Sequence, residues 1–250
     1  METMNLSDEK KAHALDRANR RRSGKVAFFA HWARIVVVSL ALFVVIRAFG
    51  VEAFKIASGS MEHTLFEGDF LLINKLVYGA GIPGSGRKLP ALHAPRRGDI
   101  VVFTYPVDRR LNYVKRIAGL PGDTLEMRDA TLIRNGRIVP ERYVMHSADE
   151  GDQTDDEFRW QKAYLIGDAQ LQNYRPSRNN WGPLVVPVRN YFVLGDNRDN
   201  SSDSRYWGFV ADSLVRGQPI VVYYSYAPDT GDRLDWLTRV RWKRFGEIVH

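Results

Sequence analysis

The sequence predicts a mainly β protein, with an antiparallel β-sheet domain that carries a β-rich insert and follows one N-terminal transmembrane helix. Three observations lead to this prediction. An apolar run near the N-terminus follows a basic cluster. Short runs of β-branched and aromatic residues, separated by glycine- and proline-rich turns, occupy residues 50–228. Since no long amphipathic helix pattern occurs in that region, antiparallel strands must supply most of the core.

The composition narrows the class of protein. The chain has 250 residues, of which 44% are hydrophobic and 26% charged, enough for one or two compact domains. It has no cysteine, which excludes disulfides, thiolate catalysis and cysteine-ligated metal sites. A net charge of +7 fits an anionic membrane surface or nucleic acid. No nucleic-acid-binding signature accompanies it, so we expect no nucleic-acid partner.

The apolar run extends from Val26 to Ile46 and is 21 residues long. Spanning a bilayer takes roughly 20 largely apolar residues. His31 and Arg34 interrupt its first third, although an arginine there can extend its charge to the headgroups. We therefore expect residues 26–49 to form a transmembrane anchor.

The charges around this run predict its orientation. Residues 1–25 form a basic tail, with five positive residues just before the run: Arg17, Arg20, Arg21, Arg22 and Lys25. Positive flanks stay in the cytoplasm, so everything after residue 50 should lie outside it. A cleaved signal peptide and a buried core helix are the alternatives. The residues that follow the run, IRAFGVEAFKIASGSM, contain no convincing pair of small residues for a signal cleavage site.

Several segments after the anchor have strand composition. Asn135–Gly136 divides one of them into two arms, which is a strong signal for a two-residue hairpin. The segment Leu120–Asp123 reads as a tight turn. The predicted strands and hairpin arms are 70–73, 99–105, 111–120, 132–139, 191–194 and 220–226.

These strands suggest a division of the chain. We expect residues 50–127 and 190–228 to form the main β domain and residues 128–189 an inserted β domain. Residues 229–250 form an amphipathic tail that could lie on a membrane or pack on the β domain. The acidic stretch 149–157 lacks the ligand spacing of an EF-hand, which favours a solvated loop over a calcium site.

Three polar segments can carry chemistry: Ser58–Leu65, Tyr113–Arg116 and Gly195–Gly208. A serine nucleophile needs an adjacent base, and no histidine of the chain stands in a recognisable triad setting. No histidine pair with metal-ligand spacing occurs, so we expect neither a metal nor a cofactor. From the residues alone, a lysine within a strand is more often a surface residue than a base.

These three segments, together with Gly98–Phe103, resemble the signature boxes of bacterial type I signal peptidases, also called leader peptidases. The boxes occur in the family's order and span residues 56–210. The resemblance implies a membrane-bound serine endopeptidase that removes N-terminal signal peptides from exported preproteins after small residues at positions −3 and −1.

The resemblance also implies a role for each matching residue. Ser60 corresponds to the nucleophile and Lys115 to the general base. The Ser58 hydroxyl and the Ser60 backbone N–H correspond to the oxyanion hole, and Ser201 to the hydroxyl that orients the lysine. Asp203 and Arg205 correspond to a supporting ion pair. The substrate pockets correspond to Ile56, Met61, Leu65, Tyr113 and Val114.

The resemblance sets expectations for location and partners. The protein should be single-pass in the bacterial cytoplasmic membrane, with its N-terminus in the cytoplasm and its catalytic domain on the periplasmic side. Its partners should be signal peptides and the lipid bilayer, and we expect a monomer.

A lysine can act as a base only in its neutral form. Lowering its ordinary pKa of about 10.4 by about two pH units costs roughly 2.7 kcal/mol, and burial of the amine can impose this cost.

Two positions depart from the family pattern. Ala57 and His63 stand where the family often or usually has proline, and we expect the loop around Ser60 to be less constrained as a result.

Two other classes of protein stay open. A self-cleaving Ser-Lys repressor would need a DNA-binding head in place of the membrane segment, and an inactive tethered binding module would not need both Ser60 and Lys115.

Overall fold

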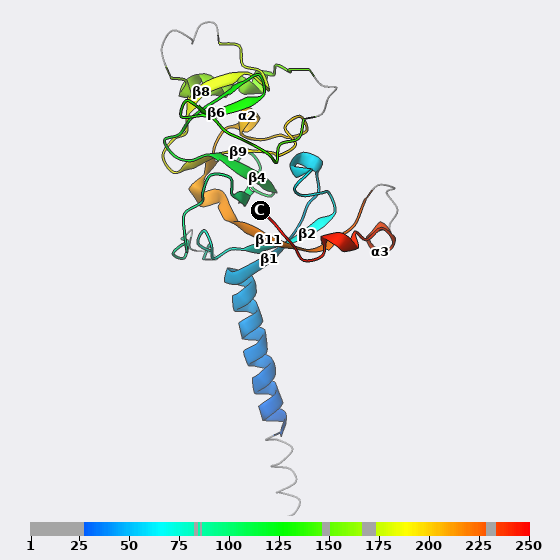
Figure 1. Cartoon of the computed structure of the whole chain (residues 1–250). Helices are drawn as coiled ribbons and strands as arrows, with labels where there is room; N and C mark the ends of the chain where they lie inside the picture. The colour runs from blue at the N-terminus through cyan, green and yellow to red at the C-terminus, as the bar shows by residue number, and fades with distance from the viewer. Residues whose placement is uncertain (1–27, 83–84, 86, 147–150, 167–173, 229–233) are drawn as a thin grey trace, which may run out of the picture. The chain divides into compact units, whose positions relative to one another are not determined.

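The computed structural model describes residues 28–82, 85, 87–146, 151–166, 174–228 and 234–250 (Figure 1). The basic tail 1–25, part of the acidic stretch and the start of the C-terminal tail lie outside the described residues. Contacts divide the chain into two units, the first ending at Arg47 and the second covering Ala48–His250.

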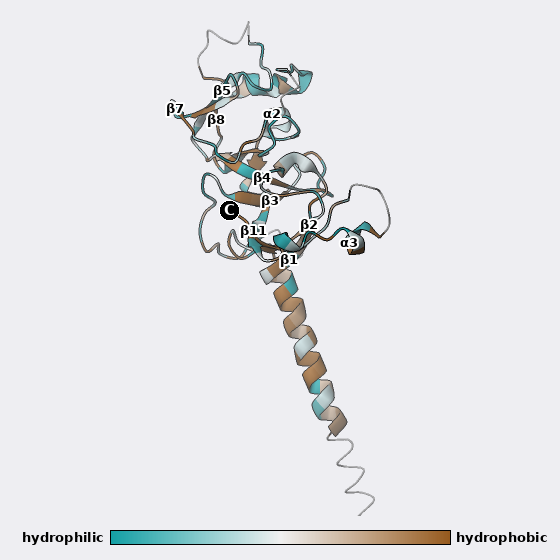
Figure 2. Cartoon of the chain, turned by 45° about the vertical axis from the view of Figure 1, so that its right-hand side comes forward, coloured by the Kyte–Doolittle hydropathy of each residue, from teal (hydrophilic) through white to brown (hydrophobic). Residues whose placement is uncertain are grey.

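The N-terminal helix spans Phe28–Gly50, 23 residues, and ends in the π-helical turn η1 (Ile46–Gly50). Its most apolar window has a mean hydropathy of 2.2 and no buried residue, and brown covers most of its length in Figure 2. Such an exposed apolar surface is stable in lipid or against a partner. The predicted N-terminal apolar helix is confirmed, and it is long and apolar enough to cross a membrane.

The second unit contains an antiparallel sheet of eight strands among its described residues, in the order β1-β2-β11-β3-β4-β9-β10, with β12 paired to β11. Strand β11 bends, pairing with β3 through its first residues and with β2 and β12 farther along. The strands are β1 (Val51–Lys55), β2 (Asp69–Asn74), β3 (Ile100–Thr104), β4 (Asn112–Gly119), β9 (Asn190–Leu194), β10 (Val210–Ala211), β11 (Val215–Ser225) and β12 (Glu247–Ile248).

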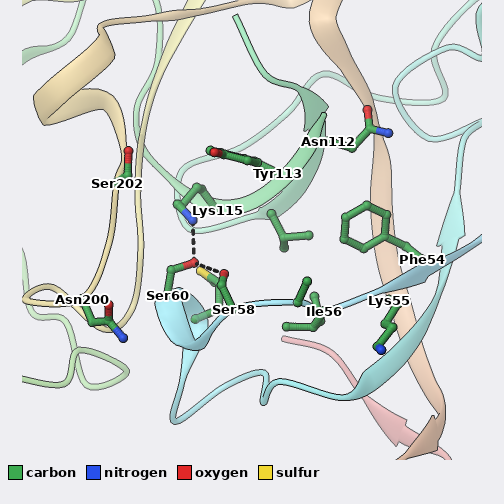
Figure 3. Close-up of a pocket in the computed structure, with 13 residues that line it drawn as sticks. Phe54, Lys55, Ile56, Ser58, Ser60, Asn112, Tyr113, Lys115, Asn200 and Ser202 are labelled. Atoms are coloured by element: carbon green, nitrogen blue, oxygen red, sulfur yellow. Dashed lines mark hydrogen bonds between the residues drawn. The ribbon is translucent and has the colours of Figure 1, made fainter. Parts of the chain in front are cut away.

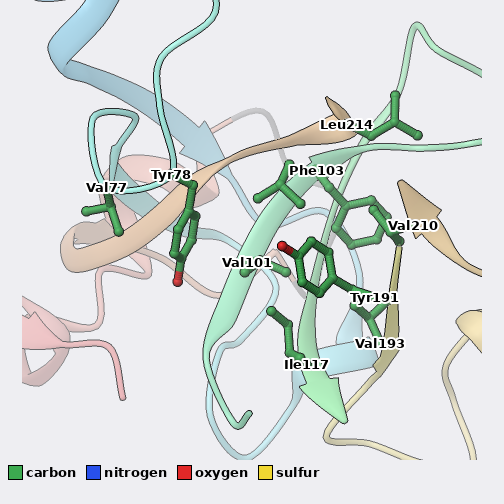
Figure 4. Close-up of a cluster of buried hydrophobic side chains, with 10 residues drawn as sticks. Val77, Tyr78, Val101, Phe103, Ile117, Tyr191, Val193, Val210 and Leu214 are labelled. Carbon is green, nitrogen blue, oxygen red and sulfur yellow. The ribbon is translucent and has the colours of Figure 1, made fainter. Parts of the chain in front are cut away.

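Burial explains why these segments form strands. Strand β2 alternates buried and half-buried residues, whereas β3 is buried over its first four residues. Side chains from β3, β4 and β9, including Phe103, Ile117 and Val193, pack in one apolar cluster (Figure 4). The strands predicted at 70–73, 99–105, 111–120, 191–194 and 220–226 are confirmed as β2, β3, β4, β9 and β11.

A second antiparallel sheet lies in the chain between β4 and β9, which are neighbours in the first sheet. Its order is β7-β6-β5-β8, with strands β5 (Thr124–Arg128), β6 (Thr131–Arg134), β7 (Arg137–Ile138) and β8 (Trp181–Val185). The predicted hairpin is confirmed: Asn135 and Gly136 have φ of 52° and 73° and join β6 to β7. The second sheet begins at Thr124, and the boundaries of an inserted domain stay a prediction.

The described helices of the second unit are short, the longest being η3 with nine residues. This confirms a mainly β protein. The helical turns are η2 (Gly59–Met61), η3 (Asp156–Tyr164), α2 (Ser204–Trp207), η5 (Asp212–Leu214), α3 (Asp235–Thr238) and η6 (Trp242–Arg244).

The C-terminal segment packs on the β domain through β12 and through Arg244. The Arg244 guanidinium donates to both carboxylate oxygens of Asp69, at 3.0 and 2.8 Å, and Asp69 is fully buried. Ser225 Oγ and the Phe66 backbone N–H also donate to this carboxylate. Of the two sequence alternatives for the tail, packing on the β domain is therefore the one found for its described part. Trp242 nevertheless remains exposed.

We predict that Arg244→Ala lowers the free energy of unfolding by about 3 kcal/mol, because it removes the guanidinium that binds both oxygens of a buried carboxylate and leaves only Arg241, at 3.9 Å, as a described cation near it. Chemical denaturation in detergent measures this change. Lys243→Ala is the matched control, since Lys243 is the exposed neighbour and its loss should stay within about 0.5 kcal/mol. Equal effects of the two substitutions would contradict the proposed importance of the Asp69 contact.

Candidate active site

Ser60 lies in the short turn η2, between strands β1 and β2. These two strands are antiparallel, so the turn is part of the connection that reverses the chain, and Ser60 is largely buried there, at 8% exposure. The Ser58 hydroxyl lies 3.4 Å from the Ser60 hydroxyl. The backbone N–H of Asn197 donates to the Ser60 carbonyl at 3.1 Å, which ties this turn to the segment after β9.

Lys115 lies in β4 and is 4% exposed. Its Nζ donates to Ser60 Oγ at 2.6 Å, joining residues that are 55 positions apart in the sequence (Figure 3). The register of β4 against β3, which pairs Lys115 with Val101, fixes the position of the lysine along the strand. The structure thus brings together the two residues that the sequence analysis assigned as nucleophile and base.

The surroundings of Lys115 lower its pKa to about 8. Burial of the amine is the largest cause, because the charged form loses its hydration. Asp203 and Asp196 raise the pKa, whereas Arg205 lowers it. At pH 8 roughly half of such amines are neutral, so Lys115 is able to accept a proton from Ser60 near neutral pH.

Asp203 and Arg205 form a buried ion pair close to this lysine. The Arg205 Nε and Nη2 atoms each donate to one carboxylate oxygen of Asp203, both at 2.8 Å. Burial alone would raise the pKa of Asp203, but Arg205 and further hydrogen bonds hold it below its ordinary value. The carboxylate therefore stays ionised and paired with arginine.

Ser201 belongs to the same cluster. Its hydroxyl donates to Asp203 Oδ2 at 2.8 Å, while the described hydrogen bond of the Lys115 amine is the one to Ser60. Both Ser201 and Ser60 lie against Gly195: a Cβ atom at residue 195 would be 2.2 Å from Ser201 Oγ and 2.5 Å from the Ser60 carbonyl oxygen. Only glycine lets the segment after β9 approach this closely.

A second buried ion pair supports the opposite face of β4. Arg116 follows Lys115 and points away from it, as neighbouring residues of a strand do. Its Nη2 and Nε atoms donate to Asp196 at 2.7 and 2.9 Å, and Asp196 accepts from the Thr64 hydroxyl at 2.6 Å. Arg116 also donates to the carbonyl oxygen of the C-terminal His250 at 3.2 Å. The sequence analysis did not identify this network, although all of these residues except His250 lie inside the matched boxes.

A cleft of about 340 Å³ opens beside Ser60 and Lys115 (Figure 3). Four of the five predicted pocket residues line it: Ile56, Met61, Tyr113 and Val114. Leu65 does not; it is fully buried in the apolar cluster beneath, with Ile56 and Met61. The sequence analysis missed further lining residues, including Phe54, Lys55, Asn112, Asn200 and Ser202. The strand alternation of β1 would have revealed Phe54.

His63 lies outside this cleft and lines a separate pocket together with Arg116. Its φ of 82° is a conformation that proline cannot adopt, so the loop here differs from one shaped by proline. Backbone hydrogen bonds from Thr64 and Leu65 to the Met61 carbonyl hold the loop instead. In the described residues, no three histidine or acidic side chains gather as a metal site.

The arrangement is suited to nucleophilic catalysis. A serine hydroxyl contacts a buried amine whose pKa is low enough for it to act as a base, and both face a cleft whose exposed surface is mostly apolar. The Ser58 hydroxyl lies beside the Ser60 hydroxyl, where it can donate to an oxyanion formed there.

Comparisons with known proteins found a matching family and several similar proteins. Residues 29–224 match the model of the family described as signal peptidase, peptidase S26. The chain is 37% identical to signal peptidase I of Pseudomonas aeruginosa over 80% of this chain and 74% of that protein. It is 32% identical to signal peptidase I T of Bacillus subtilis over 81% of this chain and 89% of that protein. A solved structure of a signal peptidase I from Enterococcus faecalis has 33% identity, covers 51% of this chain and 98% of that chain, and gives a TM-score of 0.34.

We predict that Gly195→Ala destabilises the protein by about 1–3 kcal/mol, because the added methyl group must displace Ser201 or Ser60. Thermal unfolding measures the loss. Gly81→Ala is the matched control, since no residue other than its two chain neighbours lies within 4 Å of the methyl group added there. If both variants unfold at the wild-type temperature, the packing of residue 195 against the two serines is not as close as described.

Proposed function

This chain belongs to the signal peptidase family, peptidase S26, and we propose that it removes N-terminal signal peptides from exported preproteins with Ser60 as nucleophile and Lys115 as general base. One observation carries the assignment of the two residues. The Lys115 amine, with a pKa lowered to about 8, lies 2.6 Å from the Ser60 hydroxyl at the edge of a cleft.

The proposed reaction begins with transfer of the Ser60 hydroxyl proton to the neutral Lys115 amine, while the serine oxygen bonds to the scissile carbonyl carbon. Collapse of the tetrahedral intermediate breaks the C–N bond. The Lys115 ammonium then returns the proton to the departing amine, which is the new N-terminus of the mature protein. A water molecule, deprotonated by the same lysine, then attacks the acyl carbonyl carbon. The ester C–O bond to Ser60 breaks, the lysine ammonium returns the proton to the serine oxygen, and the cleaved signal peptide leaves as a carboxylate.

The Ser58 hydroxyl and the Ser60 backbone N–H are proposed to stabilise the oxyanion of this intermediate. The 3.4 Å separation of the Ser58 and Ser60 hydroxyl oxygens supports this role, since it leaves the Ser58 side chain next to the carbon under attack. One donor of this kind contributes about 10²- to 10³-fold to the rate.

Ser201 is proposed to orient the lysine amine. Its single proton is committed to Asp203, so its oxygen lone pairs remain for a hydrogen bond from Lys115. The Asp203–Arg205 pair is proposed to hold Ser201 in that position. Because Arg205 binds both carboxylate oxygens, Asp203 stabilises the lysine ammonium less than a free carboxylate would.

The cleft is proposed to select small side chains at positions −1 and −3 of the signal peptide. Its walls next to Ser60 come from Ile56, Met61, Tyr113 and Val114, and Leu65 forms the packing beneath them. Each pocket of this kind discriminates by about 1–3 kcal/mol per methylene, so two positions together give useful selectivity.

The apolar helix Phe28–Gly50 is proposed to anchor the enzyme in the cytoplasmic membrane. The basic residues of the tail before it favour a cytoplasmic N-terminus and place the catalytic domain on the periplasmic side. This location would bring the cleft to preproteins as they leave the membrane.

We predict that Ser60→Ala and Lys115→Ala each reduce cleavage of a preprotein by about 10⁴-fold or more, since nucleophile and base act as one unit. His63→Ala is the control and should retain near-wild-type cleavage, because His63 lines another pocket. Incubation of detergent-solubilised protein with a preprotein, followed by N-terminal sequencing of the product, measures this. An inactive His63→Ala with an active Lys115→Ala would overturn the lysine assignment, and an active Ser60→Ala would overturn the nucleophile.

We also predict the pH dependence of cleavage. The active form of Lys115 is neutral, so kcat/KM should rise about tenfold per pH unit below pH 8 and level off above it. The pH profile of a short peptide substrate measures the apparent pKa. A midpoint near 6.5 that His63→Ala abolishes would show that a histidine, not Lys115, is the base.

A further inference from the structure

Lys55 is a cation at the catalytic cleft that the proposed chemistry does not use. It is the last residue of β1, which is an edge strand of the large sheet, and it lines the cleft together with Phe54 and Ile56. Burial alternates along β1, and the exposed side chain of Lys55 leaves the strand on the side opposite to Phe54 (Figure 3).

The amine of Lys55 is held at a defined point. Its Nζ donates to the Tyr226 hydroxyl at 2.8 Å and lies 5.2 Å from the centre of the Tyr226 ring. The Phe70 ring, at 5.8 Å, lies on the same side. No carboxylate of the described residues pairs with Lys55, and two of the three amine protons remain free for another acceptor.

The geometry of an extended substrate determines which of its side chains meet this amine. Successive side chains of an extended peptide point to opposite sides. If the small residues at −1 and −3 enter the apolar side of the cleft, where Ile56 and Tyr113 lie, then those at −2 and −4 point to the other side. Lys55 points to that other side of β1 as well.

We infer that Lys55 is a specificity-determining residue that favours signal peptides with an acidic side chain at position −2 or −4. This inference rests on the proposed function, because it concerns the substrate of the same cleft. Glutamate at these positions would accept a charge-assisted hydrogen bond from the Lys55 amine, whereas a lysine there would face a like charge.

The expected size of the preference is modest. Lys55 is exposed, so the ion pair remains in contact with water and salt. Exposed pairs of this kind correspond to about a two- to fivefold change in kcat/KM. The preference should also weaken as the salt concentration increases.

The experiment uses the full chain in detergent and matched peptides with alanine at −3 and −1. Glutamate, glutamine and lysine are exchanged at −2, at −4 and, as a control, at −5. The wild-type protein should cleave the glutamate peptide two- to fivefold better than the glutamine peptide at −2 or −4, but equally well at −5. Lys55→Gln should abolish this preference, and Lys55→Glu should reverse it in favour of lysine.

Lys162→Gln is the control variant, because Lys162 is an exposed lysine of η3 that does not line the cleft. It should keep the wild-type preference. Equal cleavage of the glutamate and glutamine peptides at both even positions, or a preference that survives in Lys55→Gln, would overturn the role of Lys55 alone. Failure to cleave any peptide, including the glutamine references, would instead overturn the proposed function and this inference with it.

Discussion

The contact between the Lys115 amine and the Ser60 hydroxyl depends on one physical constraint, which is that a lysine must be buried without a carboxylate partner of its own. Burial makes the ammonium form costly and lowers the pKa to about 8. A carboxylate bonded to Lys115 would favour its ammonium form, which cannot accept a proton. The surrounding structure buries the amine away from solvent. It also pairs the nearby carboxylates with arginines rather than with Lys115.

Two arginines pair with the carboxylates near Lys115. Asp203 and Asp196 both raise the pKa of Lys115, yet Arg205 and Arg116 engage both oxygens of their respective carboxylates. The two ion pairs come from the segment after β9 and from β4 itself. The Arg116–Asp196 pair joins that segment to β4, and the Thr64 hydroxyl, which also donates to Asp196, joins it to the loop after Ser60. The Asp203–Arg205 pair braces the segment itself. Gly195 completes the contact, because Ser60 and Ser201 both occupy the space that a side chain at residue 195 would need.

Parts of the chain that are distant in sequence contact the segments that carry the site residues. The C-terminal segment adds β12 to the edge of β11, and Arg244 donates to the Thr64 carbonyl as well as to Asp69. The His250 carbonyl accepts from Arg116, which directly follows Lys115 in the sequence. The chain between β7 and β8 also contributes, since its Arg178 pairs with Asp199 and its Glu141 with Arg198 of the segment after β9. The loop that holds Ser201 is thus fastened on several sides.

The sequence by itself determined the apolar helix, most central strands and the Asn135–Gly136 hairpin, because these depend on local composition and on residue periodicity. It also determined which residues gather at the site, but only through their resemblance to known motifs. Residue chemistry alone could not pair Ser60 with Lys115, since strand register brings them together across 55 positions. Only the tertiary structure decided the burial of Lys115, the arginine partners of the two carboxylates, the displacement of Leu65 into the core and the exclusion of His63 from the cleft. Each of these depends on contacts between distant segments, and a linear pattern of residue types does not specify such contacts.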